Sequence, residues 1–293
     1  MKYGFIKENA GLFKVELMCK CFNVSRSGYY NWLKREPSQR ALDNMTLDQR
    51  ITAVFIKHKR RYGSPRIAKE LIDNGVKCSK NRVARRMRLL KLKARGRRKY
   101  KVTTLSEHTL PIFPNLLKRD FTATGPNQKW VSDITYVWTE QGWLYLCVFI
   151  DLFSRAVVGW SMNKIINRHL VCDALTMALW RRGFPRGVIV HSDRGSQYSS
   201  KQYRRLLSQH KLKGSMSKKG DCWDNAVAES FFHTIKGELI NDMLFTTREQ
   251  AKQEIFEYIE CYYNNDRAHS TINYLTPNKF EKMYYNLRKK GVH

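Results

Sequence analysis

The stretch WLYLCVFI, residues 143–150, constrains the fold more than any other part of the sequence because it is nearly all apolar. An apolar run of this length, rich in aromatic and β-branched side chains, is typical of a strand buried on both faces of a sheet. Residues 130–138 before it and 156–162 after it also have strand composition. Turn signals separate the three segments, Gln141-Gly142 and residues 151–154, so we expect an antiparallel three-stranded meander.

The remainder of this half of the chain alternates between helical and strand patterns. We expect helices at residues 169–182, 200–210, 224–240 and 247–263, and short strands at 188–190 and 214–216. This order predicts an α/β domain over residues 125–285, with a mixed five-stranded sheet covered by helices, and a tail of residues 286–293.

The first 95 residues are expected to be all helical, in two small segments, 1–40 and 41–95. In the first segment one apolar helix face is expected, and Asn23 or Ser25 is expected to cap a second short helix. The apolar face would consist of Leu12, Val15, Leu17 and Met18. A helix-turn-helix and a plain helical pair both fit this pattern.

Residues 41–95 give a sharper helix-turn-helix pattern. A helix over residues 46–60 is expected to bury Leu47, Ile51, Val54 and Phe55. Ser64 is expected to cap the next helix, Asn74-Gly75 to end it, and Ser79 to cap a third helix that reaches about Leu92. Two short helices joined by a glycine turn, the second one basic, are typical of a DNA-binding helix-turn-helix.

Four arginines of the third helix are expected to face outward and contact DNA: Arg82, Arg85, Arg86 and Arg88. A solvated basic face on an ordinary helical pair is the alternative. The basic run continues into residues 96–124, whose Thr, Ser and Pro content predicts a linker.

The charge of the chain indicates a polyanionic partner. Lys plus Arg is 54 and Asp plus Glu is 25, which gives +29, and residues 1–124 alone hold 30 basic and 9 acidic residues, net +21. Neutralising phosphates releases counterions, so we expect nucleic acid as the partner, although a basic ribosomal-type protein has similar composition.

No apolar stretch approaches the roughly 18 residues of a membrane span, and the start does not resemble a secretory signal, so we expect a cytoplasmic protein. The seven cysteines include no C-x-x-C pair and are expected to be buried thiols.

Three acids are candidates for catalysis because of where they lie. Asp133 interrupts a strand otherwise suited to burial, which is unfavourable unless the carboxylate is paired or binds metal. Asp193 follows the end of an apolar strand, where α/β sheets place ligand sites. Glu229 points away from the apolar stripe of its helix and shares one side of it with Asn225 and Lys236.

Converging carboxylates with open positions are what Mg²⁺ requires, and two such ions can drive phosphoryl transfer. Each acid could instead pair with a nearby arginine, and periodicity alone does not show that the three acids meet. His191 beside Asp193 is expected to be a packed histidine at the strand end, Gly195 to let the loop turn, and Tyr198 to pack.

The motifs WVSDITYV, HSDRGSQYSS and NAVAESFFHTIKGEL resemble those of integrase-like transposases of bacterial insertion sequences, the second-frame protein of the IS3 type in the DDE superfamily. The three acids of that family's motif correspond to Asp133, Asp193 and Glu229, with 35 residues between the last two. The Lys or Arg that follows the glutamate on the same helix in that family corresponds to Lys236. The later YNNDRAHS segment and residues 24–32 and 60–71 match as well.

The resemblance implies an RNase H-like core that cleaves and joins DNA ends with Mg²⁺ or Mn²⁺, with two ions per site. Lys236 and Asn225 would contact DNA. It also implies a homo-oligomer and an upstream-frame DNA-binding partner or fusion. A non-catalytic DNA-binding protein, such as a regulator or inactive remnant, is the alternative; a viral-type integrase would be expected to carry an N-terminal His/Cys zinc module, and none is visible.

Overall fold

A five-stranded sheet forms the centre of the larger of two compact units in a computed structural model, which describes residues 1–95, 111–218 and 222–289. The units are Met1–Lys93 and Ala94–His293. In the larger unit the strand order is β3-β2-β1-β4-β5. The strands are β1 (Lys129–Thr139), β2 (Gly142–Asp151), β3 (Val157–Asn163), β4 (Ile189–Ser192) and β5 (Lys213–Met216).

The sheet is mixed, as expected from the sequence. β1, β2 and β3 form the predicted antiparallel meander, and β4 and β5 add to it in parallel. The apolar run lies in β2, whose last six residues are all buried, as a central strand requires. The parallel pairing of β1 with β4 is short, from Lys129↔Ile189 to Val131↔His191.

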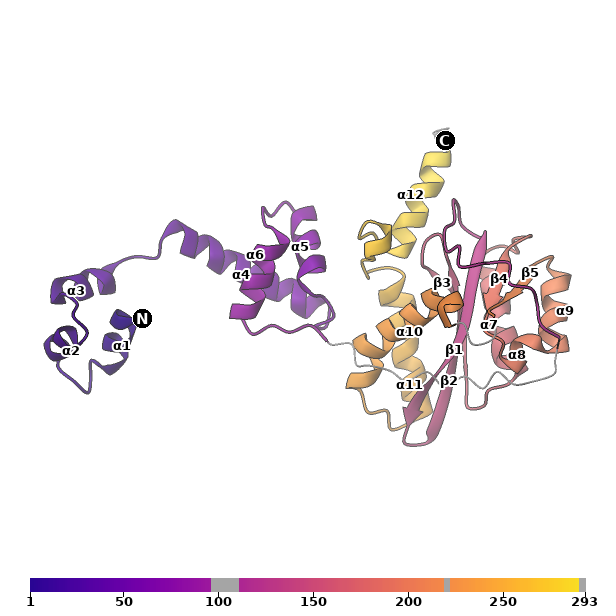
Figure 1. Cartoon of the computed structure of the whole chain (residues 1–293), viewed down its shortest axis with the longest axis horizontal. Helices are drawn as coiled ribbons and strands as arrows, with labels where there is room; N and C mark the ends of the chain where they lie inside the picture. Colours follow the sequence, from indigo (N-terminus) through magenta and orange to yellow (C-terminus); the bar gives the residue numbers. More distant parts are fainter. Residues whose placement is uncertain (96–110, 219–221, 290–293) are drawn as a thin grey trace. The chain divides into compact units, whose positions relative to one another are not determined.

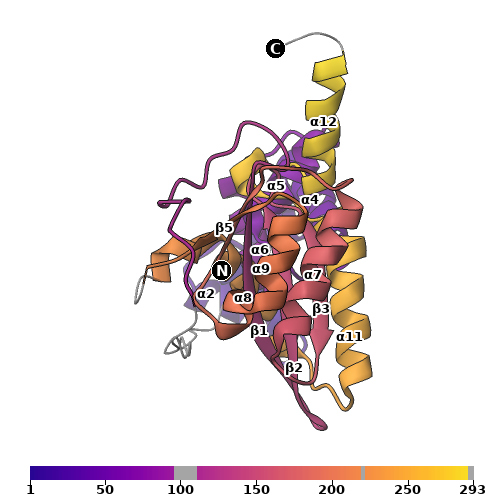
Figure 2. The same cartoon turned by 90° about the vertical axis from the view of Figure 1, so that its right-hand side faces the viewer.

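Helices cover both faces of the sheet (Figure 1). On one face lie α7 (Arg168–Arg181), α8 (Ser196–Ser199) and α9 (Lys201–Gln209), which stand in front of the strands in Figure 2. On the other lie α10 (Ala226–Glu238) and α11 (Arg248–Phe256). Side chains of β1 alternate between the two cores, with Val131 and Val137 in one and Trp130 in the other.

The segment expected to be one α-helix over residues 224–240 is not a single α-helix. It consists of a 3-10 helix (Cys222–Asn225), α10 and a second 3-10 helix (Ile240–Asp242). The helix expected over 247–263 changes from α11 to a π-helix at Glu257–Tyr263. A 3-10 turn (Ser270–Ile272) and α12 (Pro277–Lys289) follow; α12 contains the first residues of the predicted tail, and residues 290–293 lie outside the described part.

Part of the predicted linker, residues 96–124, belongs to the larger unit. Its residues 96–110 lie outside the described part of the chain, but residues 113–117 pack along β5. The amides of Leu116 and Leu117 donate to Ser215 Oγ at 2.9 and 3.3 Å, and Leu117 is buried. The Phe113 ring covers Gly214, where an added Cβ would lie 2.7 Å from Phe113 Cζ. Burial of these apolar side chains holds a segment whose composition is that of a loop.

The smaller unit begins with α1 (Lys2–Asn9), α2 (Val15–Cys21) and α3 (Arg26–Lys34). Ser25 caps α3 as expected, accepting from the Gly28 amide at 3.0 Å. The expected apolar face is wrong in part, because Leu12 and Leu17 are exposed while Met18 is buried. The sequence signal also missed α1, whose Ile6 completes this small core.

The following helices are α4 (Gln39–Lys57), α5 (Ser64–Asp73) and α6 (Lys80–Leu89). All four apolar residues expected in α4 are buried, and Ser79 caps α6 by accepting from the Arg82 amide at 3.2 Å. Asn74-Gly75 ends α5, with Gly75 at a φ of 79°. Ser64 is not the cap of α5: Gly63 takes that position, and Pro65 stands in the first turn.

The described helices include none long and apolar enough to cross a membrane. Among the described cysteines, Cys19, Cys147 and Cys172 are buried free thiols, as expected, whereas Cys21 and Cys261 are exposed.

Candidate active site

The register between β1 and β4 places two of the predicted acids side by side. Paired residues differ by 60 in number, as in Val131↔His191, so the same offset leads from Asp133 to Asp193 just beyond the last pair. Asp133 Oδ1 accepts from the Ile134 amide at 2.8 Å, and Asp193 Oδ1 accepts from the Gly195 amide at 3.0 Å. Both carboxylates are therefore fixed by backbone donors at the end of β4.

Electrostatics join the third acid to this pair. Burial raises the pKa of Asp133 well above its ordinary value, and the negative charges of Asp193 and Glu229 raise it further, while Lys236 opposes them. Burial also raises the pKa of Glu229, against the charge of His233. The fold thus brings Asp193 and Glu229 close enough to Asp133 for their charges to act on it, which periodicity alone could not establish.

Glu229 lies on α10 as the periodicity predicted. Phe231, Ile235 and Leu239 face the core and are buried, whereas Glu229 is only half-buried. Val227, expected in the same stripe, is only partly buried. Among the described residues no three His, Cys, Asp or Glu side chains lie near enough to hold a single ion. The three acids therefore share a site without forming a compact ligand set in this conformation.

Asn225 does not lie where a DNA-contacting residue is expected. Its side chain is 5% exposed, and Nδ2 donates to the Ser132 carbonyl oxygen at 3.1 Å. Oδ1 is buried without a hydrogen-bond partner among the described residues. Asn225 thus ties the start of α10 to β1, one residue from Asp133, and its contact with DNA stays a prediction.

Lys236 is also turned inward. It is 9% exposed, and Nζ lies 4.8 Å from the centroid of the Tyr136 ring. Burial lowers its pKa to about 8, while the negative charge of Asp133 opposes that shift. Its positive charge is therefore held next to the acids, where it offsets part of their repulsion.

Asp224 is a structural residue of this site that the sequence pattern did not reveal. It is 2% exposed and accepts from Asn115 Nδ2 at 2.9 Å, Arg119 Nε at 3.1 Å and the Lys218 amide at 2.9 Å. Burial raises its pKa, but these donors outweigh burial and leave the pKa below its ordinary value. Its side-chain partners are more than 100 residues away, so the only local signal was an acid before a helix.

His191 and Tyr198 pack as expected, whereas Gly195 was expected to let the loop turn and instead has a φ of −58°, which any residue can adopt. Both ring nitrogens of the buried His191 contact hydroxyls, Ser215 at 2.8 Å and Ser217 at 3.2 Å, and burial lowers its pKa to about 4. A Cβ on Gly195 would lie 3.1 Å from Asp193 Oδ1, so this loop position favours glycine through close approach. The fully buried Tyr198 packs below β1, with its hydroxyl 2.8 Å from Ser132 Oγ.

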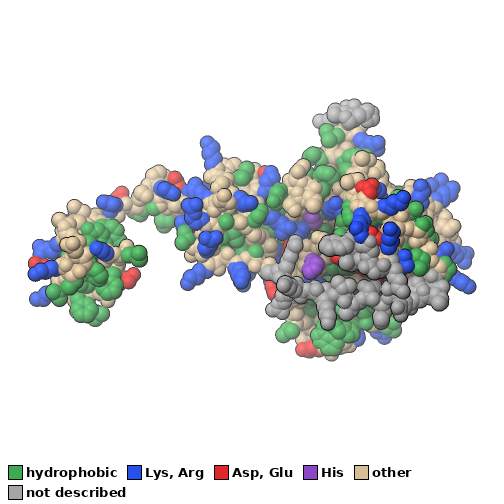
Figure 3. Space-filling view, viewed as in Figure 1, with side chains coloured by type: hydrophobic (Ala, Val, Ile, Leu, Met, Phe, Trp, Pro, Cys, Tyr) green, Lys and Arg blue, Asp and Glu red, His purple; other side chains and the backbone are tan. Residues whose placement is uncertain are grey.

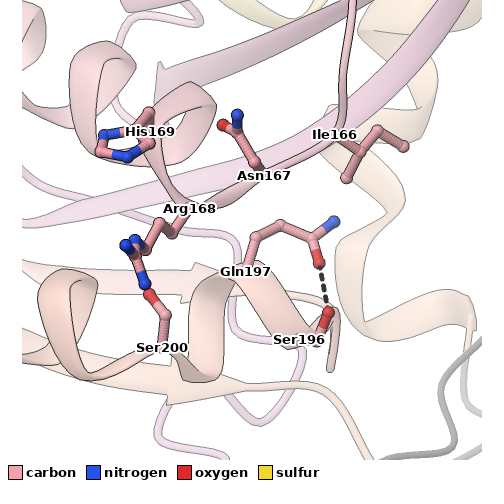
Figure 4. Close-up of a pocket in the computed structure, with 7 residues that line it drawn as sticks. All are labelled: Ile166, Asn167, Arg168, His169, Ser196, Gln197 and Ser200. Atoms are coloured by element: carbon pink, nitrogen blue, oxygen red, sulfur yellow. Dashed lines mark hydrogen bonds between the residues drawn. The ribbon is translucent and has the colours of Figure 1, made fainter.

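A pocket of about 340 Å³ lies beside the loop that follows Asp193 (Figure 4). The start of α7 forms one side, and the other side comes from α8 and the residue after it. Ser196 Oγ donates to Gln197 Oε1 at 3.2 Å inside it. The lining residues are Ile166, Asn167, Arg168, His169, Ser196, Gln197 and Ser200, none of which was a predicted site residue.

In the smaller unit only part of the predicted basic face points to solvent. Arg82 Nη2 donates to Asn44 Oδ1 at 2.9 Å, and Arg86 forms a bidentate ion pair with Asp48. These two arginines join α6 to α4, so the expectation that they face outward is wrong. Arg85 and Arg88 are exposed, as predicted.

Comparison with protein families matches two models described as an integrase core domain, at residues 123–222 and 229–285. A model described as an HTH-like domain matches residues 42–100. The chain is 48% identical to the transposase InsF for insertion sequence IS3A of Escherichia coli (strain K12), over 96% of this chain and 98% of that protein. It is 43% identical to an uncharacterized 31 kDa protein of insertion element IS600 from Shigella sonnei, over 92% of this chain and 99% of that protein.

Among solved structures, the chain is similar to the HTLV-2 integrase catalytic core domain in complex with magnesium, at 18% identity. That match covers 55% of this chain and 99% of the other, with a TM-score of 0.42. A simian T-cell lymphotropic virus intasome in complex with the PP2A regulatory subunit B56 gamma matches at 16% identity and a TM-score of 0.46, covering 60% of this chain and 59% of that one.

Proposed function

Since this chain belongs to the IS3 family of insertion-sequence transposases, we propose that Asp133, Asp193 and Glu229 hold the divalent metal ions with which it cleaves and joins DNA. The chain is a transposase with an RNase H-like integrase core of the DDE type, a polynucleotidyl transferase, and an HTH-like region. The proposal assigns the chemistry of that core to three particular side chains.

The observation that carries the proposal is the register of β1 with β4, which sets Asp193 beside Asp133, together with Glu229 near enough for its charge to act on Asp133. Uncompensated negative charge in a partly buried site is costly unless a cation neutralises it. The donors are all carboxylate oxygens, the ligand type that Mg²⁺ and Mn²⁺ prefer. The residues therefore fit a divalent ion by charge and by donor chemistry.

Bound ions, two per site in our proposal, would supply charge neutralisation at the phosphate and a lower pKa for the attacking water or 3′-hydroxyl. Asp133 and Asp193 would hold them, because backbone amides already fix both carboxylates. Glu229 would join them by a movement of its half-buried side chain, since the three acids do not form a compact ligand set in this conformation. Lys236 would balance charge beside Asp133 and turn toward the DNA backbone when a phosphate enters.

DNA is the partner that the HTH-like and integrase regions indicate. We propose that Arg85 and Arg88 on the exposed side of α6 contact its phosphates. We further propose that the enzyme acts as a homo-oligomer on bacterial DNA in the cytoplasm, because two element ends require two sites. An upstream-frame partner or fusion would add recognition of those ends.

The test is Asp193→Asn in the full chain, which removes a carboxylate charge and keeps the side-chain size. We expect strand cleavage and transfer with Mg²⁺ to fall by more than the 10- to 100-fold typical of losing an outer partner of a metal ligand. Binding to duplex DNA without metal should be unchanged. Activity is measured on a duplex that carries the terminal repeats of the element.

Asp173→Asn is the matched control, because Asp173 is an exposed acid of α7 outside the site. It should retain full activity. Equal activity of Asp193→Asn and the wild type would refute the assignment. A wild-type chain that binds but never cleaves would support the non-catalytic alternative instead.

A further inference from the structure

Three neighbouring aromatic side chains lie on the β1–β2 hairpin, the half-buried Tyr136 and the exposed Trp138 and Trp143, and we call them the aromatic face. Trp138 pairs with Trp143 in the register, and the Trp143 ring lies between the other two. Its centroid is 4.8 Å from that of Trp138 and 5.0 Å from that of Tyr136, both edge to face. The three rings are thus one continuous surface.

The aromatic face contrasts with the rest of its strands. Trp138 is 57% and Trp143 42% exposed, whereas β2 is buried from Leu146 to its end. Figure 3 shows hydrophobic side chains gathered at the lower end of this unit, where Figure 1 draws the turn between β1 and β2. Neighbouring large exposed rings on a strand end are typical of a binding surface.

This surface is connected to the catalytic acids around an open strand edge. Within the described residues β1 pairs with β4 only from Lys129 to Val131, so residues 132–139 have a strand neighbour on one side alone. Lys236 lies at this edge, with Nζ over the Tyr136 ring and its charge acting on Asp133. A bound chain could therefore pass from the acids to the rings without crossing the sheet.

Cations lie on chain segments next to the aromatic face. Arg248 Nε donates to the Trp143 carbonyl oxygen at 3.0 Å. The exposed Lys164 and Arg168 follow the end of β3, whose Asn163 pairs with Tyr145, while Glu140 in the turn adds one negative charge. Aromatic rings beside cations are the surface that binds single-stranded nucleic acid, through base stacking and phosphate attraction.

We propose that the aromatic face stacks unpaired bases of the DNA strand whose phosphate lies at Asp133, Asp193 and Glu229. The inference rests on the proposed function, since it places that DNA at those acids. Trp138 is five residues from Asp133, or about 17 Å along an extended strand. At about 3.4 Å per stacked base, this reach corresponds to roughly five nucleotides from the reacting phosphate. The enzyme would hold open the few base pairs next to the cleavage point.

The test uses Trp138→Ala, Trp143→Ala and the double variant in the full chain. Binding without metal is measured by fluorescence anisotropy with a labelled single-stranded 20-mer and with a fully paired duplex. We expect roughly a 5- to 150-fold loss of single-strand affinity per lost stacked base, and a much smaller change with the duplex. Trp138→Phe and Trp143→Phe should retain most of the affinity because they keep a ring.

Cleavage by the same variants is compared on two duplexes, one fully paired and one mismatched over the five pairs next to the cleavage point. The alanine variants should lose more rate on the paired duplex, because mismatches remove the need to hold the strands apart. Trp180→Ala is the matched control: Trp180 is 70% exposed on α7 and lies against Phe184. It should behave as the wild type in both assays.

Equal single-strand affinity in the wild type and the double alanine variant would overturn the proposal. So would a change of oligomeric state in sedimentation without a change in DNA affinity, because the aromatic face would then bind a second copy of the chain. The outcome is separable from that of the proposed function. Asp193→Asn should bind the single strand normally, and continued cleavage by Asp193→Asn would refute the metal assignment without affecting the stacking result.

Discussion

Asp133 shows how much one residue can reveal. A carboxylate is unfavourable in a strand rich in buried residues, and in the fold Asp133 lies near two further acids, Asp193 and Glu229. A carboxylate in such surroundings has a raised pKa and becomes favourable when a cation arrives. The unusual position of this acid in a strand was visible in the sequence, but the neighbouring acids were identified only by the tertiary structure.

Glu70 gives a prediction at the same scale in the smaller unit. Burial raises its pKa, but hydrogen bonds with His58 at 2.7 Å and Lys57 at 2.9 Å outweigh burial and lower it to about 2. Because the folded pKa lies below the unfolded value near 4.5, the stabilisation is complete above pH 4.5 and is lost as the pH falls toward 2. Glu70→Gln should lower the free energy of unfolding of this unit by about 1–2 kcal/mol at pH 7, after allowance for solvent screening.

Calorimetry of the full chain at pH 7, 4.5 and 3 measures this difference, which should shrink at pH 3. Asp73→Asn is the control, since its ion pair with Lys69 is exposed and worth only about 0.3–0.5 kcal/mol. A difference for Glu70→Gln that stays constant from pH 7 to pH 3 would contradict the assignment.

At the scale of elements, α10 is fixed at both ends. Asn225 joins its start to β1, and Glu238 near its end accepts from Arg267 and Tyr258. The Arg267 guanidinium is 3% exposed and donates through Nε and Nη2, at 2.8 to 3.1 Å. The YNNDRAHS segment thus acts as a structural support of the helix that carries Glu229.

Arg267→Met should therefore destabilise the larger unit by about 3–5 kcal/mol, because it leaves the Glu238 carboxylate buried without its cation. Combining it with Glu238→Gln should recover part of that loss by removing the unpaired charge. Urea unfolding of the full chain measures both. Arg181→Met is the control, because its pair with Glu260 is more exposed and worth about 0–1 kcal/mol. If the losses of unfolding free energy in Arg267→Met and Glu238→Gln simply add in the double variant, the two side chains are not coupled.

At the scale of the whole molecule, the net charge of +29 governs the encounter with DNA. For about 6–10 phosphate contacts, affinity should fall by about 10³–10⁵ between 50 and 200 mM salt. Arg85→Ala and Arg88→Ala should each reduce the slope of log affinity against log salt by about 1, if each contacts one phosphate. Salt titrations by fluorescence anisotropy measure the slopes; Arg186→Ala, an exposed cation in the turn after α7, should leave the slope unchanged. Slopes equal to that of the wild type in both α6 variants would place the DNA elsewhere.

The sequence by itself determined the kinds of elements and much of their order. Local periodicity identifies a buried strand such as residues 143–150, and local chemistry identifies caps such as Ser79 and stops such as Asn74-Gly75, because these effects act over a few residues. It also identified the three acids, two as strand misfits and Glu229 by its angle to the apolar stripe.

Only the tertiary structure decided what the polar side chains meet. Asn225 and Lys236 share the predicted helix side with Glu229 but are buried against β1, and Arg82 and Arg86 bind α4 instead of facing solvent. Asp224 is fixed by side chains more than 100 residues away, and residues 113–117 pack on β5 despite a loop-like composition. The physical reason is that periodicity encodes which side of an element is apolar, whereas the partner of a polar group comes from a distant segment. The three acids that we propose for catalysis follow the same rule: the sequence singled out each one, and the pairing of β1 with β4 and the packing of α10 set Asp193 and Glu229 near Asp133.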